Sequence, residues 1–149
     1  PPETLSEIEA AAWRAKQLVF ASQDATCQTP YNAVTFPPED EGGAWTVYLV
    51  PQPTEANVIA LSGHMRVTVD VDASAILKAQ DFSASCILVR RNADTTQLAI
   101  DYGWASMPAE THVLNSLLHQ LMFFVGTGDG VFRVNGNIVE RVADVAPGA

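Results

Sequence analysis

The chain has 149 residues, of which 48% are hydrophobic and 17% are charged. This composition is typical of one globular domain with a sizeable core and excludes an intrinsically disordered chain. The net charge of −9, with only eight Lys and Arg residues, excludes a nucleic-acid partner, because phosphate binding needs clustered cations. The chain has no apolar run long enough for a membrane-spanning helix, which needs roughly 18 or more residues.

The two cysteines bear on the compartment. Cys27 and Cys86 form no Cys-x-x-Cys pair and make a poor zinc set with the scattered His residues. A disulfide between them would fit a periplasmic or secreted location, whereas the alternative is two buried free thiols in a cytosolic protein. The chain begins with Pro1-Pro2 instead of Met, which predicts that a signal peptide has been removed. We expect the disulfide, and neither a cofactor nor a metal.

The first predicted element is an N-terminal helix. Thr4 and Glu7 have the spacing of a capping box. Apolar residues then recur at spacings of three and four, forming a stripe of Leu5, Ile8, Ala12, Ala15 and Val19. Residues 22–43 are rich in Pro and Gly and are expected to be mostly connection. The acidic residues 39–41 within them lack the ligand spacing of a calcium loop.

Residues 58–72 alternate between apolar and polar side chains, which predicts a half-buried strand. We expect one long strand bent at Gly63. The alternative, a hairpin loop at Ser62-Gly63, would mix core and charged residues on one face. Further strands are predicted at residues 44–50, 76–82 and 86–90. Their short connections predict an antiparallel meander, covered on its apolar face by the N-terminal helix.

The C-terminal part is expected to be rich in strands. Strands are predicted at residues 98–102, 121–127, 131–134 and 138–142, and Asn135-Gly136 is a strong hairpin signal between the last two. Residues 111–120 are ambiguous, because the leucines fit a helix while Thr111-His112-Val113 favours a strand. We expect a strand.

The predicted fold is therefore α+β and forms a single domain. Residues 1–91 supply the helix and the first meander, and residues 92–149 supply the β-rich part. Whether the C-terminal meander joins the first sheet or forms its own sheet stays open.

The polar face of the long strand carries the first candidate binding residues. They follow one another about 7 Å apart in a row formed by His64, Arg66, Thr68 and Asp70. The guanidinium of Arg66 could bind a carboxylate or phosphate through two hydrogen bonds. An ordinary solvent face of a one-sided sheet would show the same pattern.

Trp104 is a separate candidate, because it lies in a predicted loop beside Tyr102 and Met107. An exposed aromatic loop often marks a contact surface, although the same loop could instead fold back over the core.

Other patterns support weaker sites. The glycine-rich residues 126–130 lack the Lys and the following helix of a phosphate loop and are expected to form a hairpin loop. His112 and His119 are seven residues apart, which is too far for one metal ion on a single helix face. Asp101 and Glu110 flank the loop of Trp104 and could act as an acid–base pair on sugars, but nothing in the sequence fixes their separation.

Residues 63–70, followed by a turn and by residues 82–86, resemble segments of small secreted or periplasmic bacterial proteins. The helix followed by a meander is also similar to the PepSY and cystatin-like layouts. The resemblance covers about half of the chain, to about Cys86. The turn has Asp72-Ala73-Ser74 in place of the expected glycine. The resemblance implies an extracytoplasmic α+β module without an established activity, and it identifies no catalytic residue.

Together these features predict a non-enzymatic extracytoplasmic binding protein whose partner is another protein or a small ligand. One alternative is a small hydrolase or lyase with a site around His64 and Arg66. Another is a purely structural subunit. Substituting either residue would separate the first two, because only an enzyme would lose turnover.

Overall fold

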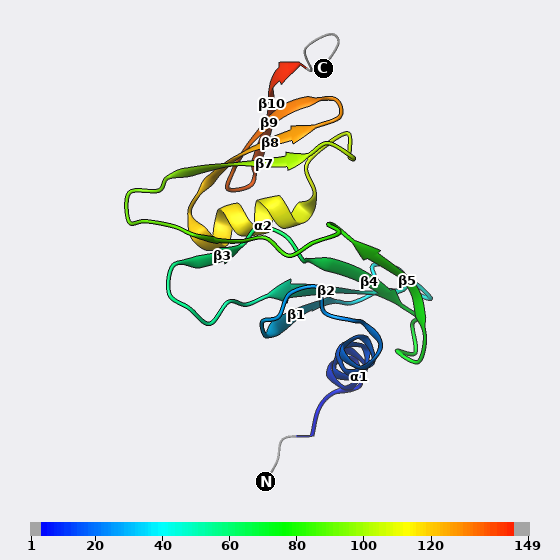
Figure 1. Cartoon of the computed structure of the whole chain (residues 1–149). Helices are drawn as coiled ribbons and strands as arrows, with labels where there is room; N and C mark the ends of the chain where they lie inside the picture. Colours follow the sequence, from blue (N-terminus) through cyan, green and yellow to red (C-terminus); the bar gives the residue numbers. More distant parts are fainter. Residues whose placement is uncertain (1–3, 145–149) are drawn as a thin grey trace. The chain divides into compact units, whose positions relative to one another are not determined.

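A computed structural model describes residues 4–144 of the chain (Figure 1). Within these residues the chain forms two helices and ten strands, grouped into two compact units. Unit 1 contains the residues up to Ala56 together with Ser62–Ile87. Unit 2 contains Asn57–Leu61 and the residues from Leu88 onward. The α+β class predicted from the sequence is confirmed.

Helix α1, Glu7–Ser22, begins unit 1. Ser6 is its N-cap residue, since the Ser6 hydroxyl accepts from the backbone N–H of Glu9 and the Glu9 carboxylate accepts from the backbone N–H of Ser6 at 2.8 Å. These two hydrogen bonds form a capping box at the start of the helix. The Ser6 hydroxyl, at 2.6 Å, and the Ser6 backbone N–H both donate to the Glu9 carboxylate and hold its pKa below the ordinary value. The capping box is therefore Ser6–Glu9, and the predicted Thr4–Glu7 pair was wrong.

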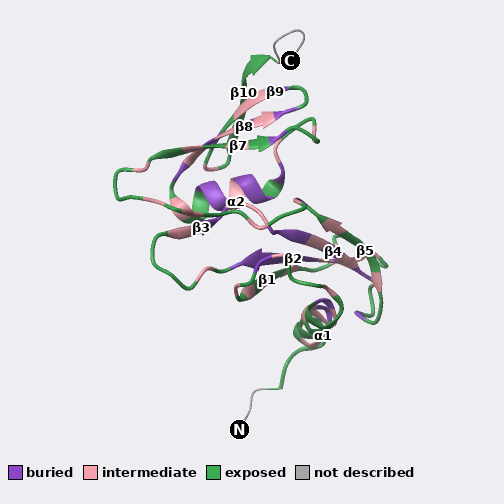
Figure 2. Cartoon of the chain, in the orientation of Figure 1, coloured by how far each residue is buried: buried purple, intermediate pink, exposed green. Residues whose placement is uncertain are grey.

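The sheet of unit 1 is antiparallel and has the strand order β1-β2-β4-β5. Its strands are β1 (Tyr31–Phe36), β2 (Trp45–Pro51), β4 (Met65–Val69) and β5 (Ile76–Asp81). Helix α1 contacts β1 and β2. The core beside it consists of Ala15, Val19, Trp45, Val47, Leu49, Met65, Val67, Val69 and Ala73, and Figure 2 shows buried residues along β2 and β4.

Two expectations for unit 1 are corrected. Strand β1 lies within residues 22–43, which were expected to be mostly connection. It is an edge strand in which Val34 and Phe36 lie on the exposed side, while the other side, with Tyr31, Ala33 and Thr35, is only partly buried. The strand therefore has no apolar face that its sequence could reveal. Of the predicted apolar stripe, Leu5 precedes α1 and Ile8 lies in its first turn, and both are exposed, because the buried contact is made farther along by Ala15 and Val19.

The long strand predicted over residues 58–72 is also wrong. The chain forms two strands there, β3 (Val58–Ala60) and β4, and they belong to different sheets. Strand β3 pairs antiparallel with β6 (Leu88–Arg90) in unit 2. Gly63 lies between the strands with a φ of +89°, a conformation that L side chains rarely adopt. The hairpin alternative fails as well, because β3 and β4 do not pair with each other.

Unit 2 is built on a second four-stranded sheet with the order β10-β9-β8-β7. Its elements are β7 (Gln97–Tyr102), α2 (Glu110–His119), β8 (Met122–Thr127), β9 (Gly130–Asn135) and β10 (Ile138–Asp144). Strands β8, β9 and β10 form the predicted antiparallel meander, and it makes a sheet of its own. Strands β7 and β8 are parallel and are joined through α2, so this part is a β-α-β unit.

Residues 111–120, expected to be a strand, lie mostly within helix α2. The helix buries polar residues and leaves leucines at the surface, which is the reverse of the usual amphipathic pattern. Its buried residues are Thr111, His112, Asn115 and Ser116. Leu117 and Leu118 are 55% and 61% exposed. The leucine spacing that fits a helix was therefore correct about the element, but the leucines do not mark its buried side.

The predicted disulfide is confirmed, since Cys27 and Cys86 are joined across 59 residues of chain. It links the segment after α1 to the segment before β6. The hydroxyl of Tyr31 accepts from the backbone N–H of Cys27 at 3.0 Å and donates to the carbonyl of Gly63 at 2.9 Å. The turn at Gly63 is thereby fixed against the disulfide.

Candidate binding site

The row of polar residues predicted on the long strand does not act as one set. Asp70 lies beyond β4 and its carboxylate closes a turn, accepting from the backbone N–H groups of Ser74 at 2.6 Å and Ala75 at 2.8 Å. The bonds from Ala75 and Ser74 hold the pKa of Asp70 below its ordinary value. His64 precedes β4 and is 2% exposed.

Arg66 and Thr68 remain on β4, on the sheet face away from α1. The guanidinium of Arg66 donates to the side-chain oxygen of Gln80 at 2.7 Å and lies 5.7 Å from the ring centre of Phe82. Gln80 stands opposite Arg66 in the register of β4 and β5. This arrangement holds the guanidinium of Arg66 against β5. Gln80 and Phe82, which make these contacts, do not belong to the predicted row.

The remaining patterns have structural roles. Residues 126–130 form the end of β8 and its turn into β9, as expected for a hairpin loop. His112 is buried, and desolvation lowers its pKa to about 4. His119 lies at the other end of the same helix, and its pKa is lowered by burial and by the positive charge of Arg91. Within residues 4–144, no group of three or more His, Cys, Asp or Glu residues is arranged to hold a metal ion.

A more favourable location lies at the carboxyl ends of the parallel strands β7 and β8. In open α/β sheets ligands bind outside the carboxyl ends of parallel strands, and β7 and β8 are the one parallel pair of this sheet. Strand β7 ends at Tyr102 and strand β8 ends at Thr127, which are partners in the register. The connection from β7 to α2, residues 103–109, begins at this edge, and we call it the Trp104 loop.

The Trp104 loop presents large side chains to solvent on a fixed support. Trp104 is 66% exposed and Met107 is 60% exposed. The Trp104 ring contacts the buried ring of Tyr102 edge-on, with centroids 4.7 Å apart. Tyr102 in turn contacts the ring of His112 on α2 at 4.9 Å. The exposed indole is therefore packed on one edge against the interior of unit 2.

Hydrogen bonds attach both ends of the Trp104 loop to the β-α-β unit. At its start, the backbone N–H of Ala105 donates to the carbonyl of Tyr102 at 3.1 Å. At its end, the backbone N–H of Ala109 donates to Nδ1 of His112 at 3.0 Å. This second bond is half of a capping box, because His112 is the third residue of α2.

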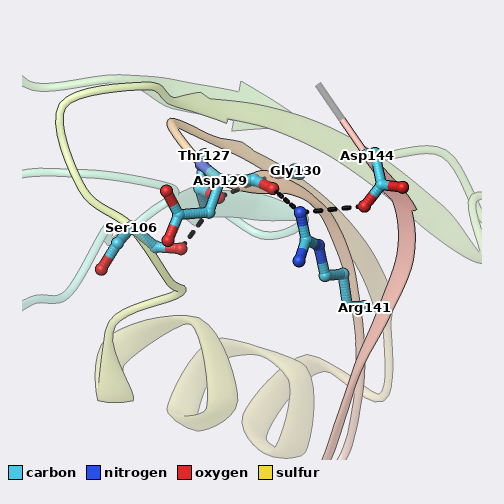
Figure 3. A network of polar contacts seen from close by, with 6 residues as sticks. All are labelled: Ser106, Thr127, Asp129, Gly130, Arg141 and Asp144. Carbon is cyan, nitrogen blue, oxygen red and sulfur yellow. Dashed lines mark hydrogen bonds and ion pairs between the residues drawn. The ribbon is translucent and has the colours of Figure 1, made fainter. Parts of the chain in front are cut away.

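The middle of the loop is bonded to the turn between β8 and β9. The backbone N–H of Gly128 donates to the carbonyl of Ala105 at 2.7 Å. The hydroxyl of Thr127 lies 3.2 Å from the carbonyl oxygen of Ser106 and 2.9 Å from that of Gly130, and it accepts from the backbone N–H of Asp129 (Figure 3). The loop is thus held at three places along its length.

Arg141 of β10 completes this network. Its guanidinium donates to the carbonyl oxygen of Asp129 and forms an ion pair with Asp144 at 2.9 Å (Figure 3). Gly130 leaves room for this side chain, since a Cβ there would lie 2.9 Å from Nε of Arg141. Strand β10 therefore supports the β8–β9 turn, to which the Trp104 loop is bonded.

Sequence reasoning identified Trp104 but not the residues that hold its loop. Thr127, Gly128 and Arg141 act through backbone carbonyls, and no side-chain pattern in the sequence marks such contacts. The parallel pairing of β7 with β8 was the missing information, because it places residues 102 and 127 side by side.

Comparisons with protein families, with curated proteins and with solved structures find no match. The resemblance to PepSY and cystatin-like layouts therefore stays a prediction. Neither of the two described helices is long and apolar enough to cross a membrane.

Proposed function

We propose that this chain is a non-enzymatic, extracytoplasmic binding protein that engages another protein through the Trp104 loop. The observation that carries the proposal is the exposure of Trp104 and Met107, at 66% and 60%, on a loop held by hydrogen bonds at its start, middle and end. Large aromatic side chains dominate the binding energy of many interfaces. A loop that is ordered before binding loses less conformational entropy on association.

The Cys27–Cys86 disulfide supports the extracytoplasmic part of the proposal. Disulfides form and persist in oxidising compartments and are rare in the cytosol, where thiols are kept reduced. The secreted or periplasmic location predicted from the sequence is consistent with this bond.

The alternative of an enzyme working around His64 and Arg66 gains no support from the arrangement of those residues. His64 is buried, and Arg66, Thr68 and Asp70 are each half-buried. The carboxylate of Asp70 is already engaged by the turn at residues 70–75.

Trp104→Ala is the substitution that tests the proposal. Peptides are selected from a random display library on the wild-type protein, and their dissociation constants are then measured for wild type and for Trp104→Ala. We expect the substitution to weaken binding by about tenfold or more, the size of an interface hot spot.

Trp13→Ala is the matched control. Trp13 is 57% exposed on α1 in unit 1, so its loss removes a similar amount of exposed indole elsewhere. The selected peptides should bind this variant as tightly as wild type. Peptides that bind Trp104→Ala with unchanged affinity, for example by pairing with the edge strand β10, would contradict the proposal.

A further inference from the structure

The stretch of sequence that contains the Trp104 loop carries charged side chains of one sign only. Residues 92–132 contain four carboxylates and no Lys or Arg. In sequence order they are Asp94, Asp101, Glu110 and Asp129. A stretch of 41 residues without a basic side chain leaves this part of unit 2 negative wherever its carboxylates are exposed.

Two of these carboxylates lie next to the loop, one at the end of β7 and one in the turn between β8 and β9. Asp101 is exposed at the end of β7, and its Oδ1 accepts from the backbone N–H of Gly103 at 3.0 Å. Asp129 is exposed in the turn between β8 and β9 (Figure 3). It directly follows Gly128, whose backbone N–H donates to the carbonyl of Ala105. The backbone hydrogen bonds of the loop therefore keep both carboxylates beside it.

The cation that the structure places at this turn does not offset these carboxylates. Arg141 binds the carbonyl of Asp129, while its charge is paired with the carboxylate of Asp144. Among residues 4–144, no Lys or Arg forms an ion pair with the carboxylate of Asp101 or of Asp129. The surface around Trp104 thus combines an exposed aromatic ring with net negative charge.

We infer that the partner of the Trp104 loop is a protein segment with a Lys or Arg side chain next to an apolar residue. This inference rests on the proposed function and names the chemistry of the partner. A cation placed over the face of an indole is attracted by the ring and, here, also by the carboxylates of Asp101 and Asp129. Met107 offers an adaptable apolar contact for the neighbouring residue. An acidic segment would be repelled by the same carboxylates.

The test is a peptide-display selection on three proteins. They are wild type, Asp101→Asn/Asp129→Asn, and the control Asp24→Asn/Glu39→Gln. The first double variant removes the two charges beside the loop, and the Asn amide oxygen at 101 can still accept from Gly103. The control removes two exposed charges of unit 1, so both variants have the same net charge.

The expected result is a pool enriched in Lys and Arg beside apolar residues on wild type and on the control variant. Selection on Asp101→Asn/Asp129→Asn should lose this enrichment. Individual peptides from the wild-type pool should bind the loop variant about 2- to 30-fold more weakly, the sum expected for two exposed charge pairs. Raising the salt concentration should weaken binding to wild type in the same direction.

The results separate this inference from the proposed function. A pool that depends on Trp104 but shows no enrichment in Lys or Arg overturns the inference and leaves the proposed function standing. Equal weakening by the loop variant and the control also overturns it, because net charge alone would then explain the effect. Peptides that bind Trp104→Ala unchanged overturn both.

Discussion

Gly63 has two constraints that only glycine meets together. Its φ of +89° is a conformation that L side chains rarely adopt. A Cβ at this position would lie 2.4 Å from Sγ of Cys27 and 3.3 Å from the hydroxyl of Tyr31. Both neighbours are fixed, one by the disulfide and the other by its two hydrogen bonds, so neither can move aside easily.

The substitution Gly63→Ala is expected to destabilise the protein by more than backbone strain alone. Strain at a left-handed position costs about 1–3 kcal/mol, and the contact with the disulfide adds to it. The measurement is urea unfolding under conditions that keep the disulfide oxidised.

Gly42→Ala provides the comparison for Gly63→Ala. Gly42 has a φ of +79°, but a Cβ added there would meet no atom within 4 Å, so this variant reports backbone strain without a clash. Equal losses of unfolding free energy at the two glycines would show that the disulfide contact contributes nothing.

Single residues also set a limit on what the sequence could predict about the site. Asp70 alternates correctly with Arg66 and Thr68, yet its carboxylate is used by the turn at residues 70–75. A carboxylate on a solvent face and one that closes a turn have the same local sequence signature. Trp104 was identified because an aromatic residue between turn-forming residues is a local pattern. The residues that hold its loop were not identified, because they are distant in the sequence.

At the scale of elements, the side chain of a histidine, His112, caps the start of helix α2. Nδ1 of His112 accepts from the backbone N–H of Ala109, so this nitrogen must be unprotonated in the folded protein. Burial lowers the pKa of His112 to about 4, although the negative charge of Glu110 acts to raise it. Protonation of His112 would place a positive charge in a buried site and would remove the acceptor that caps the helix.

The pH dependence of stability follows from the depressed pKa of His112. In the unfolded chain this side chain binds a proton near pH 6.5, whereas in the folded protein it does so only near pH 4. The unfolded state therefore binds more protons between these values, and stability falls as the pH is lowered through this window. The full effect is about 3 kcal/mol and is measured as the free energy of unfolding at pH 7, 5.5 and 4.

His112→Asn separates this effect from other titrating groups such as His119. The amide oxygen of Asn can accept from Ala109 as Nδ1 does, but it does not titrate. The variant should lose less stability than wild type between pH 7 and pH 4. Parallel curves for the two proteins would contradict the assignment to His112.

Elements with a strong local pattern were predicted well, and elements defined by their partners were not. The hairpin predicted at Asn135-Gly136 forms, with its two-residue loop one residue later at Gly136-Asn137, where Gly136 has a φ of +60°. Residues 58–72 keep one alternation through two strands, because alternation records burial but not which sheet supplies the neighbour. Residues 111–120 were predicted as a strand because Thr111-His112-Val113 was given more weight than the leucine spacing, and the polar buried side of α2 gave no hydrophobic signal in favour of the helix.

At the scale of the whole chain, the disulfide lies where the chain enters and leaves unit 1. Ser62 begins the second segment of this unit and Ile87 ends it. The hydroxyl of Ser62 donates to the carbonyl of Ser85 and accepts from the backbone N–H of Ile87, both at 2.7 Å. Cys86 lies between these two partners, so the bond to Cys27 fastens this junction to the segment after α1.

Removing the disulfide should destabilise unit 1 first. Closing a loop of 59 residues restricts the unfolded chain, and its loss in Cys27→Ala/Cys86→Ala lowers the unfolding free energy by about 4 kcal/mol. Amide hydrogen exchange resolves the two units, because β2 and β4 report on unit 1 while β8 and β9 report on unit 2. We expect faster exchange in β2 and β4 than in the oxidised protein, with a smaller change in β8 and β9. Unchanged protection of β2 and β4 would contradict this role of the disulfide, whereas equal acceleration in all four strands would mean that the two units unfold together.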